Sequence, residues 1–81
     1  MGVLRVLCSQ GDAVYTWDEE KAEAGDTGAQ EAIEEAERII REAQARGAVA
    51  FKTVPGRPAE RIRGFDPHAD EIIVVPRIAG G

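Results

Sequence analysis

One long amphipathic helix is the feature of the sequence that most limits how this chain can fold. Thr27 and Gln30 match a capping box at its start, and Gly47 stands where a helix commonly ends. Its apolar residues recur at helical spacing and form a single stripe: Ala32, Ala36, Ile39, Ile40 and Ala43. Oppositely charged residues are spaced as favourable i,i+4 pairs on the polar side: Glu34–Arg38, Glu37–Arg41 and Glu42–Arg46. Such a helix covers one apolar surface and leaves its other side in water.

Five segments outside this helix have the composition of β-strands. They are residues 3–8, 13–17, 48–54, 61–63 and 71–75. A short loop with a glycine separates the first two, which predicts a hairpin. Residues 61–63 contain two arginines, as expected of a short edge strand, whereas residues 72–75 are apolar throughout, which predicts a central strand. Tyr15 and Trp17 are expected in core or cross-strand packing.

The order strand, strand, helix, strand, short strand, strand predicts an α+β fold. One helix can cover one face of one mixed sheet of four to five strands, and the first and last strands are expected side by side in parallel. Asp18 is placed to cap a single helical turn, and Asp66 with Pro67 predicts another brief turn. A chain of 81 residues forms one domain, which we place at residues 1–75, with residues 76–81 as an extended tail.

The last strand runs directly into Gly80-Gly81. Two residues without side chains can pass through a narrow channel, and their backbone can approach another enzyme's active site closely. The carboxylate of Gly81 would then be the reactive group. Pro76 would end the sheet and stiffen the start of the tail.

Residues 70–81, DEIIVVPRIAGG, together with this order of elements, resemble the ubiquitin-like β-grasp proteins. The nearest similarity is to the small sulfur carriers of the molybdopterin-synthase and thiamine pathways, and to bacterial ubiquitin-like modifiers that end in Gly-Gly. It covers about the last dozen residues in sequence and the rest of the chain in topology. The polar stretch at residues 55–64 is longer than in those carriers, and Arg77 is more typical of modifier tails. Both a carrier and a modifier therefore stay open.

The resemblance implies that Gly80 and Gly81 are the site of activation and covalent attachment. An adenylating enzyme of the ubiquitin-activating superfamily would bind ATP and the tail, and would convert the Gly81 carboxylate to an acyl-adenylate. Sulfur would then give a thiocarboxylate in a carrier, or a thioester and finally an amide on a lysine in a modifier. The further partner would be a sulfur acceptor or a lysine-bearing target protein. The chain itself would be no enzyme and would bind no cofactor, since ATP is used by the partner.

Docking to such a partner requires an exposed apolar surface. The tail residues Pro76, Arg77, Ile78 and Ala79 would contribute to it. Side chains alternate between the two faces of the first predicted strand, and alternation alone does not say which face is outward. The charge of Arg5 favours the face that carries Arg5 as the one turned away from the helix. Ile73 and Val75 would join Arg5 there. A second hypothesis is a non-covalent β-grasp interaction module that uses the same sheet and has no tail chemistry.

Other functions find less support in the composition. The net charge of −5 argues against nucleic-acid binding and favours a partner with a basic surface. No apolar run approaches a membrane span and no signal peptide is visible, so a cytoplasmic protein is expected. Cys8 is expected to be a buried structural thiol. His68 has no companion ligand at a suitable spacing and the acidic segment 18–23 is expected to be a solvated helix face, so no metal site is predicted.

Overall fold

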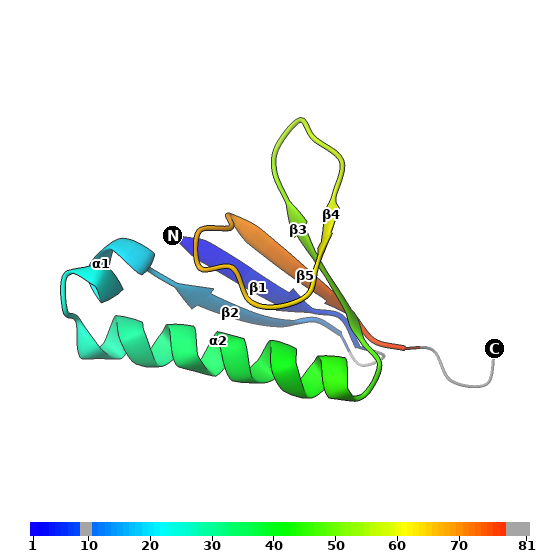
Figure 1. Ribbon diagram of the computed structural model, residues 1–81, viewed down its shortest axis with the longest axis horizontal. Coiled ribbons are helices and arrows are strands. Elements are labelled where there is room, and N and C mark those ends of the chain that lie inside the picture. The colour runs from blue at the N-terminus through cyan, green and yellow to red at the C-terminus, as the bar shows by residue number, and fades with distance from the viewer. Residues whose placement is uncertain (9–10, 78–81) are drawn as a thin grey trace.

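Five strands and two helices make up the regular structure of the described residues. The computed structural model describes residues 1–8 and 11–77 of the chain. The strands are β1 Gly2–Val6, β2 Ala13–Trp17, β3 Val49–Thr53, β4 Glu60–Ile62 and β5 Glu71–Val75, and the helices are α1 Glu19–Glu23 and α2 Thr27–Ala45 (Figure 1). Four residues of the predicted tail, Ile78, Ala79, Gly80 and Gly81, lie outside the described residues.

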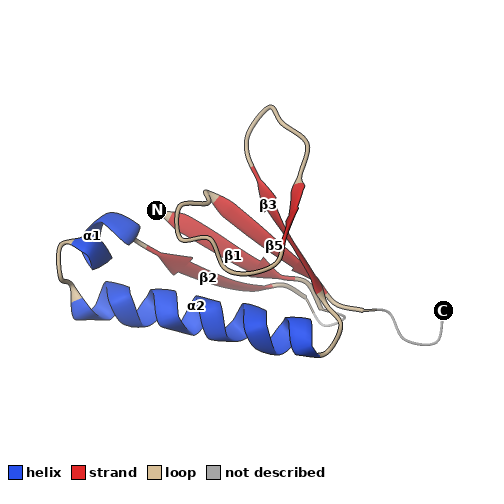
Figure 2. Ribbon diagram, viewed as in Figure 1, coloured by secondary structure: helices blue, strands red, loops and turns tan. Residues whose placement is uncertain are grey.

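The strands form one mixed sheet in the order β2-β1-β5-β3-β4. β1 and β2 are an antiparallel hairpin, β1 and β5 are parallel, and β5 is the central strand. β4 forms the edge next to β3. The predicted hairpin, parallel pair, central strand and edge strand are all confirmed, and the fold is α+β and β-grasp-like (Figure 2).

α2 covers one face of this sheet and closes the core against it (Figure 1). Ala36 and Ile40 of the helix are buried against the inward residues of the sheet, among them Leu4, Ile72 and Val74. Because side chains alternate along β5, Ile73 and Val75 are directed to the opposite face. In the described part of the chain no helix lies over that second face.

The two ends of α2 differ in how well the sequence predicted them. Its N-cap is Asp26 and not Thr27: the Asp26 Oδ1 atom accepts a hydrogen bond from Ala29 N at 2.9 Å. The Gln30 side chain donates instead to the Ala22 carbonyl, so the predicted capping box is wrong. At the other end the prediction is confirmed, since Gly47 adopts a φ of 93° and closes the helix.

Ion pairing along α2 also departs from the predicted spacing. Arg38 reaches both one turn back and one turn forward, with contacts of 2.6 Å to Glu35 and 2.7 Å to Glu42. A guanidinium offers two ends to two carboxylates at once, so the Glu35–Arg38–Glu42 group forms in place of Glu34–Arg38. Within residues 1–8 and 11–77, the other two predicted pairs, Glu37–Arg41 and Glu42–Arg46, are not formed either.

Trp17 fixes the end of the sheet nearest α1. Its side chain is buried, and its Nε1 atom donates a hydrogen bond to the Pro67 carbonyl at 2.9 Å. Its ring packs edge-on against Phe65, with 4.9 Å between the ring centroids. Gly2 lies opposite Trp17 in the ladder, and a Cβ atom there would be 2.1 Å from the indole. Core packing is thus confirmed for Trp17, whereas Tyr15 is 37% exposed.

Cys8 is exposed, so the prediction of a buried thiol is wrong. β1 ends at Val6, two residues before Cys8, because the chain turns toward β2 there. The thiol is hydrogen-bonded to the Gly11 carbonyl within that turn. The turns at Asp18 and Asp66 form as predicted, the first as the N-cap of α1 and the second through a hydrogen bond from Ala69 N to the Asp66 carbonyl.

Candidate docking face and tail root

The sheet face turned away from α2 carries one continuous row of side chains across all five strands. The strand registers place these residues next to one another in the order Val14, Arg5, Ile73, Phe51 and Arg61. We call this row and its neighbour Val75 the docking face. The structure therefore brings together Arg5, Ile73 and Val75, the three sheet residues that the sequence proposed for docking.

The docking face has an apolar centre and a basic rim. Ile73 and Phe51 are half-buried, and Val75 and Val14 are 36% and 51% exposed. Arg5 and Arg61 flank the apolar centre on either side. The parity left open by the sequence is thereby resolved, because Ile72 and Val74 point into the core.

Arg5 is held only loosely over this face. Its Nε atom lies 3.7 Å from Glu71 Oε2, and its Nη1 atom lies 3.8 Å from Asp12 Oδ2. Glu71 is itself positioned by Thr53, whose hydroxyl donates to Oε1 at 2.8 Å. Partly exposed pairs at these distances contribute little to stability, so Arg5 can exchange them for a carboxylate of a partner.

The tail leaves the sheet at the C-terminal end of α2 (Figure 1). Pro76 and Arg77 follow β5 and are exposed. The aliphatic part of Arg77 lies over Gly47, where a Cβ atom would come within 3.0 Å of its Cδ atom. Arg46 and Arg77 line one hollow of about 310 Å³ together with Cys8 and Pro76. We call this region around Arg46, Pro76 and Arg77 the tail root. It is basic, and it lies at the C-terminal end of the helix, where the macrodipole favours cations.

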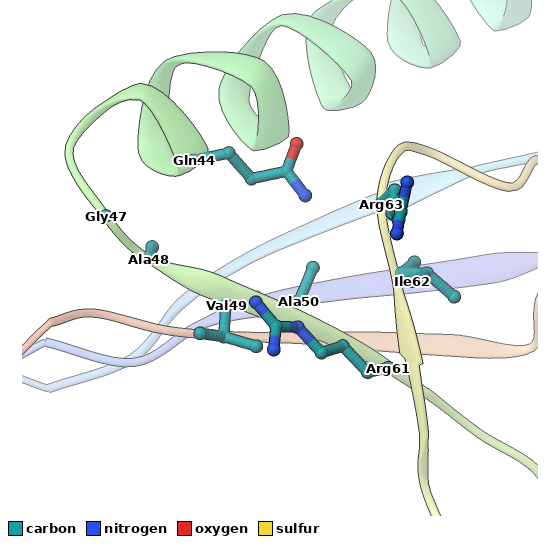
Figure 3. Close-up of a pocket in the computed structure, with 8 residues that line it drawn as sticks. All are labelled: Gln44, Gly47, Ala48, Val49, Ala50, Arg61, Ile62 and Arg63. Carbon is teal, nitrogen blue, oxygen red and sulfur yellow. The ribbon is translucent and has the colours of Figure 1, made fainter.

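One hollow among the described residues was not predicted from the sequence. It has a volume of about 630 Å³ and lies between the C-terminal end of α2 and the β3–β4 edge (Figure 3). Arg61 extends alongside Val49, whereas Arg63 lies on the side of Gln44 and the helix (Figure 3). The sequence showed the two arginines as edge-strand charges, but only the fold brings the helix end beside them.

Three side chains of the kind that bind metals meet at the opposite end of the molecule. Ligand atoms of Glu19, Glu23 and His68 lie within 4.8 Å of one another. Two carboxylates and an imidazole are ligands that Zn²⁺ accepts. His68 Nδ1 lies 2.5 Å from Glu19 Oε2, so these two side chains contact each other directly. The absence of a metal site stays a prediction.

Comparisons with known proteins add no relative to these observations. Neither the scan of protein-family models nor the searches of curated proteins and of solved structures found a match to this chain. No helix among the described residues has the length and apolar character needed to span a membrane. Function is therefore inferred from the fold, the docking face and the sequence of the tail.

Proposed function

We propose that this protein is a ubiquitin-like sulfur carrier or protein modifier that is activated at the carboxylate of Gly81. One observation carries the proposal: the central strand of a β-grasp-like sheet continues through Pro76 into a segment that ends in Gly80-Gly81. The docking face begins on the same strand, at Ile73 and Val75. A partner that binds this face is thus placed beside the start of the reactive tail.

The chemistry is activation of a carboxylate by a partner enzyme. An oxygen of the Gly81 carboxylate attacks the α-phosphorus of ATP, pyrophosphate leaves, and an acyl-adenylate forms. A sulfide or thiolate then attacks the carbonyl carbon, and AMP leaves with the former carboxylate oxygen. The product is a thiocarboxylate or a thioester. In a carrier, an acceptor takes the sulfur of the thiocarboxylate, and water restores the Gly81 carboxylate. In a modifier, a lysine amine of the target protein attacks the thioester carbonyl carbon, an amide forms and the thiol leaves. Catalysis and ATP binding belong to the adenylating enzyme, in the cytoplasm, and the chain supplies the handle and the docking surface.

Local charge indicates what kind of surface the partner presents. Arg5 and Arg61 flank the docking face, and Arg46 and Arg77 lie at the tail root. Although the whole chain has a net charge of −5, these four arginines are complemented by an acidic surface. The basic partner surface that net charge alone favoured is therefore not what we propose for this contact.

Intact-mass analysis tests the proposal directly. The protein is incubated with ATP, sulfide and each adenylating enzyme of the ubiquitin-activating superfamily from the same genome. We expect a mass gain equal to replacement of one oxygen by sulfur, or a covalent adduct with a lysine-bearing protein. Deletion of Gly81 should abolish either product, whereas the chain carrying Gly56→Ala, a change in a distant loop, should still react. The proposal is ruled out if none of these enzymes gives either product.

The open apolar row also supports the second candidate, a non-covalent interaction module. Such a module binds through Ile73 and Phe51 and makes no use of the tail. Ile73→Asp should then abolish partner binding, while deletion of Gly80 and Gly81 leaves it unchanged. In the carrier or modifier, both changes prevent formation of the activated product.

A further inference from the structure

A second surface runs along the C-terminal half of α2. The hollow of about 630 Å³ at the β3–β4 edge adjoins another of about 370 Å³, and both are lined by Gln44 and Arg63. Together they lie between residues 37–47 on one side and residues 61–65 on the other. We call this feature the α2–β4 groove. Its apolar lining includes Ile40, Ile62 and Phe65.

Three arginines line the groove without a carboxylate partner. Arg41, Arg61 and Arg63 are all exposed, and none takes part in a salt bridge among residues 1–8 and 11–77. Among the residues that the structure describes, Glu37 is the one acidic residue that lines either hollow. The groove is therefore locally positive on a chain whose net charge is −5. Such a concentration of one charge attracts ligands of the opposite charge.

The groove also contains an open sheet edge. In the described part of the chain, β4 is the last strand of the sheet and pairs with β3 alone. The β3–β4 ladder ends at the pair Ala50–Ile62. Among the described residues, Val49 therefore pairs with Val75 of β5 on one side and has no strand partner on the other. Strand edges of this kind present backbone N–H and C=O groups to which an extended peptide can add.

The two arginines of this edge approach it from different sides. Arg61 lies alongside Val49 on the docking-face side, and Arg63 lies toward Gln44 and α2 (Figure 3). Successive side chains of an added strand also point to opposite sides. Acidic residues of one extended peptide can therefore reach Arg61 on one side, and Arg63 and Arg41 on the other.

From this geometry we infer that the α2–β4 groove binds an extended, acidic peptide segment of a partner protein. The peptide adds to the β4 edge, places its carboxylates on Arg41, Arg61 and Arg63, and covers Ile62 and Phe65 with apolar side chains. This binding does not involve Gly80 or Gly81, so it holds for a carrier, a modifier or an interaction module. If the arginines instead serve only to keep the edge from pairing with other chains, no peptide binds.

An NMR titration tests the inference. The isotopically labelled protein is titrated with an end-blocked peptide that repeats Glu-Glu-Val-Val, so that an extended strand presents carboxylates on both sides. In parallel it is titrated with a peptide that repeats Lys-Lys-Val-Val. We expect saturable shifts of the backbone amides of residues 44–50 and 60–65 with the acidic peptide only. The double substitution Arg61→Glu with Arg63→Glu should weaken binding by about tenfold or more, since it reverses two exposed charge contacts.

Arg57→Glu is the matched control, because Arg57 is exposed, lies in the neighbouring loop and does not line the groove. It should change the affinity by less than about twofold, as screened charges outside a contact do. A chain without Gly81 should bind as the full chain does, which separates this result from the tail chemistry. The inference is overturned if no saturable shift occurs at millimolar peptide, if the lysine peptide binds equally, or if Arg57→Glu weakens binding as much as the double substitution. It is also overturned if the shifts map to Val14, Arg5 and Ile73 on the other strands instead.

Discussion

Truncation of two adjacent isoleucines in β5 separates the core of this protein from its docking face. Ile72 is 0% exposed and lies beside Leu4 in the ladder, so Ile72→Ala leaves a cavity in the core. Such a truncation costs about 3 kcal/mol. Ile73 is half-buried on the face without a helix. Ile73→Ala therefore exposes less apolar area to water and should lower the free energy of unfolding by only about 1 kcal/mol. A domain of this size has a free energy of unfolding of roughly 4–12 kcal/mol, so the first loss is a large fraction of the total.

Trp17 provides the assay, because it is the single tryptophan of the chain and is buried against Phe65. Its fluorescence follows unfolding in urea, where stability falls by roughly 1 kcal/mol per molar for a small domain. The transition midpoint should therefore drop by about 3 M for Ile72→Ala and by about 1 M for Ile73→Ala. Equal drops would show that both faces of β5 are covered to the same extent. That result would refute the one-sided sheet and, with it, the assignment of Ile73 to a docking face.

Three further changes test the local geometry. Gly2→Ala places a Cβ atom 2.1 Å from the Trp17 indole and should lower the free energy of unfolding by about 2 kcal/mol in the same urea assay; an unchanged midpoint would contradict the close packing. Gly47→Ala should cost about 1 kcal/mol, because its φ of 93° disfavours a side chain, and a gain in thermal stability would argue against this helix end. The pKa of Asp66 is lowered by a hydrogen bond from the backbone N–H of His68 and, to a smaller extent, by Lys52. The ionised Asp66 carboxylate therefore stabilises the fold above the unfolded-state pKa of about 4. This stabilisation is lost as the pH falls through the lower folded-state pKa. Asp66→Asn should flatten the dependence of stability on pH in that acidic window, and a dependence identical to that of the parent chain would remove Asp66 as its source.

The fold could be predicted because several weak signals agreed with one another. One apolar stripe on one helix allows one covered sheet face, and the uninterrupted run Ile72–Ile73–Val74–Val75 indicated the central position of β5. Errors arose where two residues competed for one role. Asp26 and Thr27 can both cap α2, and the carboxylate one position earlier is the group that accepts the Ala29 N–H. Element ends were also uncertain, since β1 stops before Cys8 and leaves that thiol exposed.

The candidate surfaces were harder to predict than the fold, because each combines residues from several elements. Alternation on one strand was enough to propose Ile73 and Val75 for docking, but their neighbour Phe51 required the β3–β5 register. The α2–β4 groove required more, since Gln44 and Arg63 meet only after the chain has passed through β3 and β4. No periodicity along the sequence reports such a meeting.

The distribution of charge is the reason why we propose an acidic partner surface where the net charge alone favours a basic one. In physiological salt, exposed charges are screened over about 8 Å, so a partner responds to the side chains near its contact and not to the sum over the chain. Many of the acidic residues lie on α1 and on the first half of α2, whereas Arg46 and Arg77 lie at the tail root and Arg41, Arg61 and Arg63 line the α2–β4 groove. An approaching acidic surface is therefore attracted to the end of the molecule that carries the tail and repelled by the other end. A chain that is acidic overall can in this way present a basic contact surface, and its orientation toward a partner is set before the apolar centre of the docking face is buried.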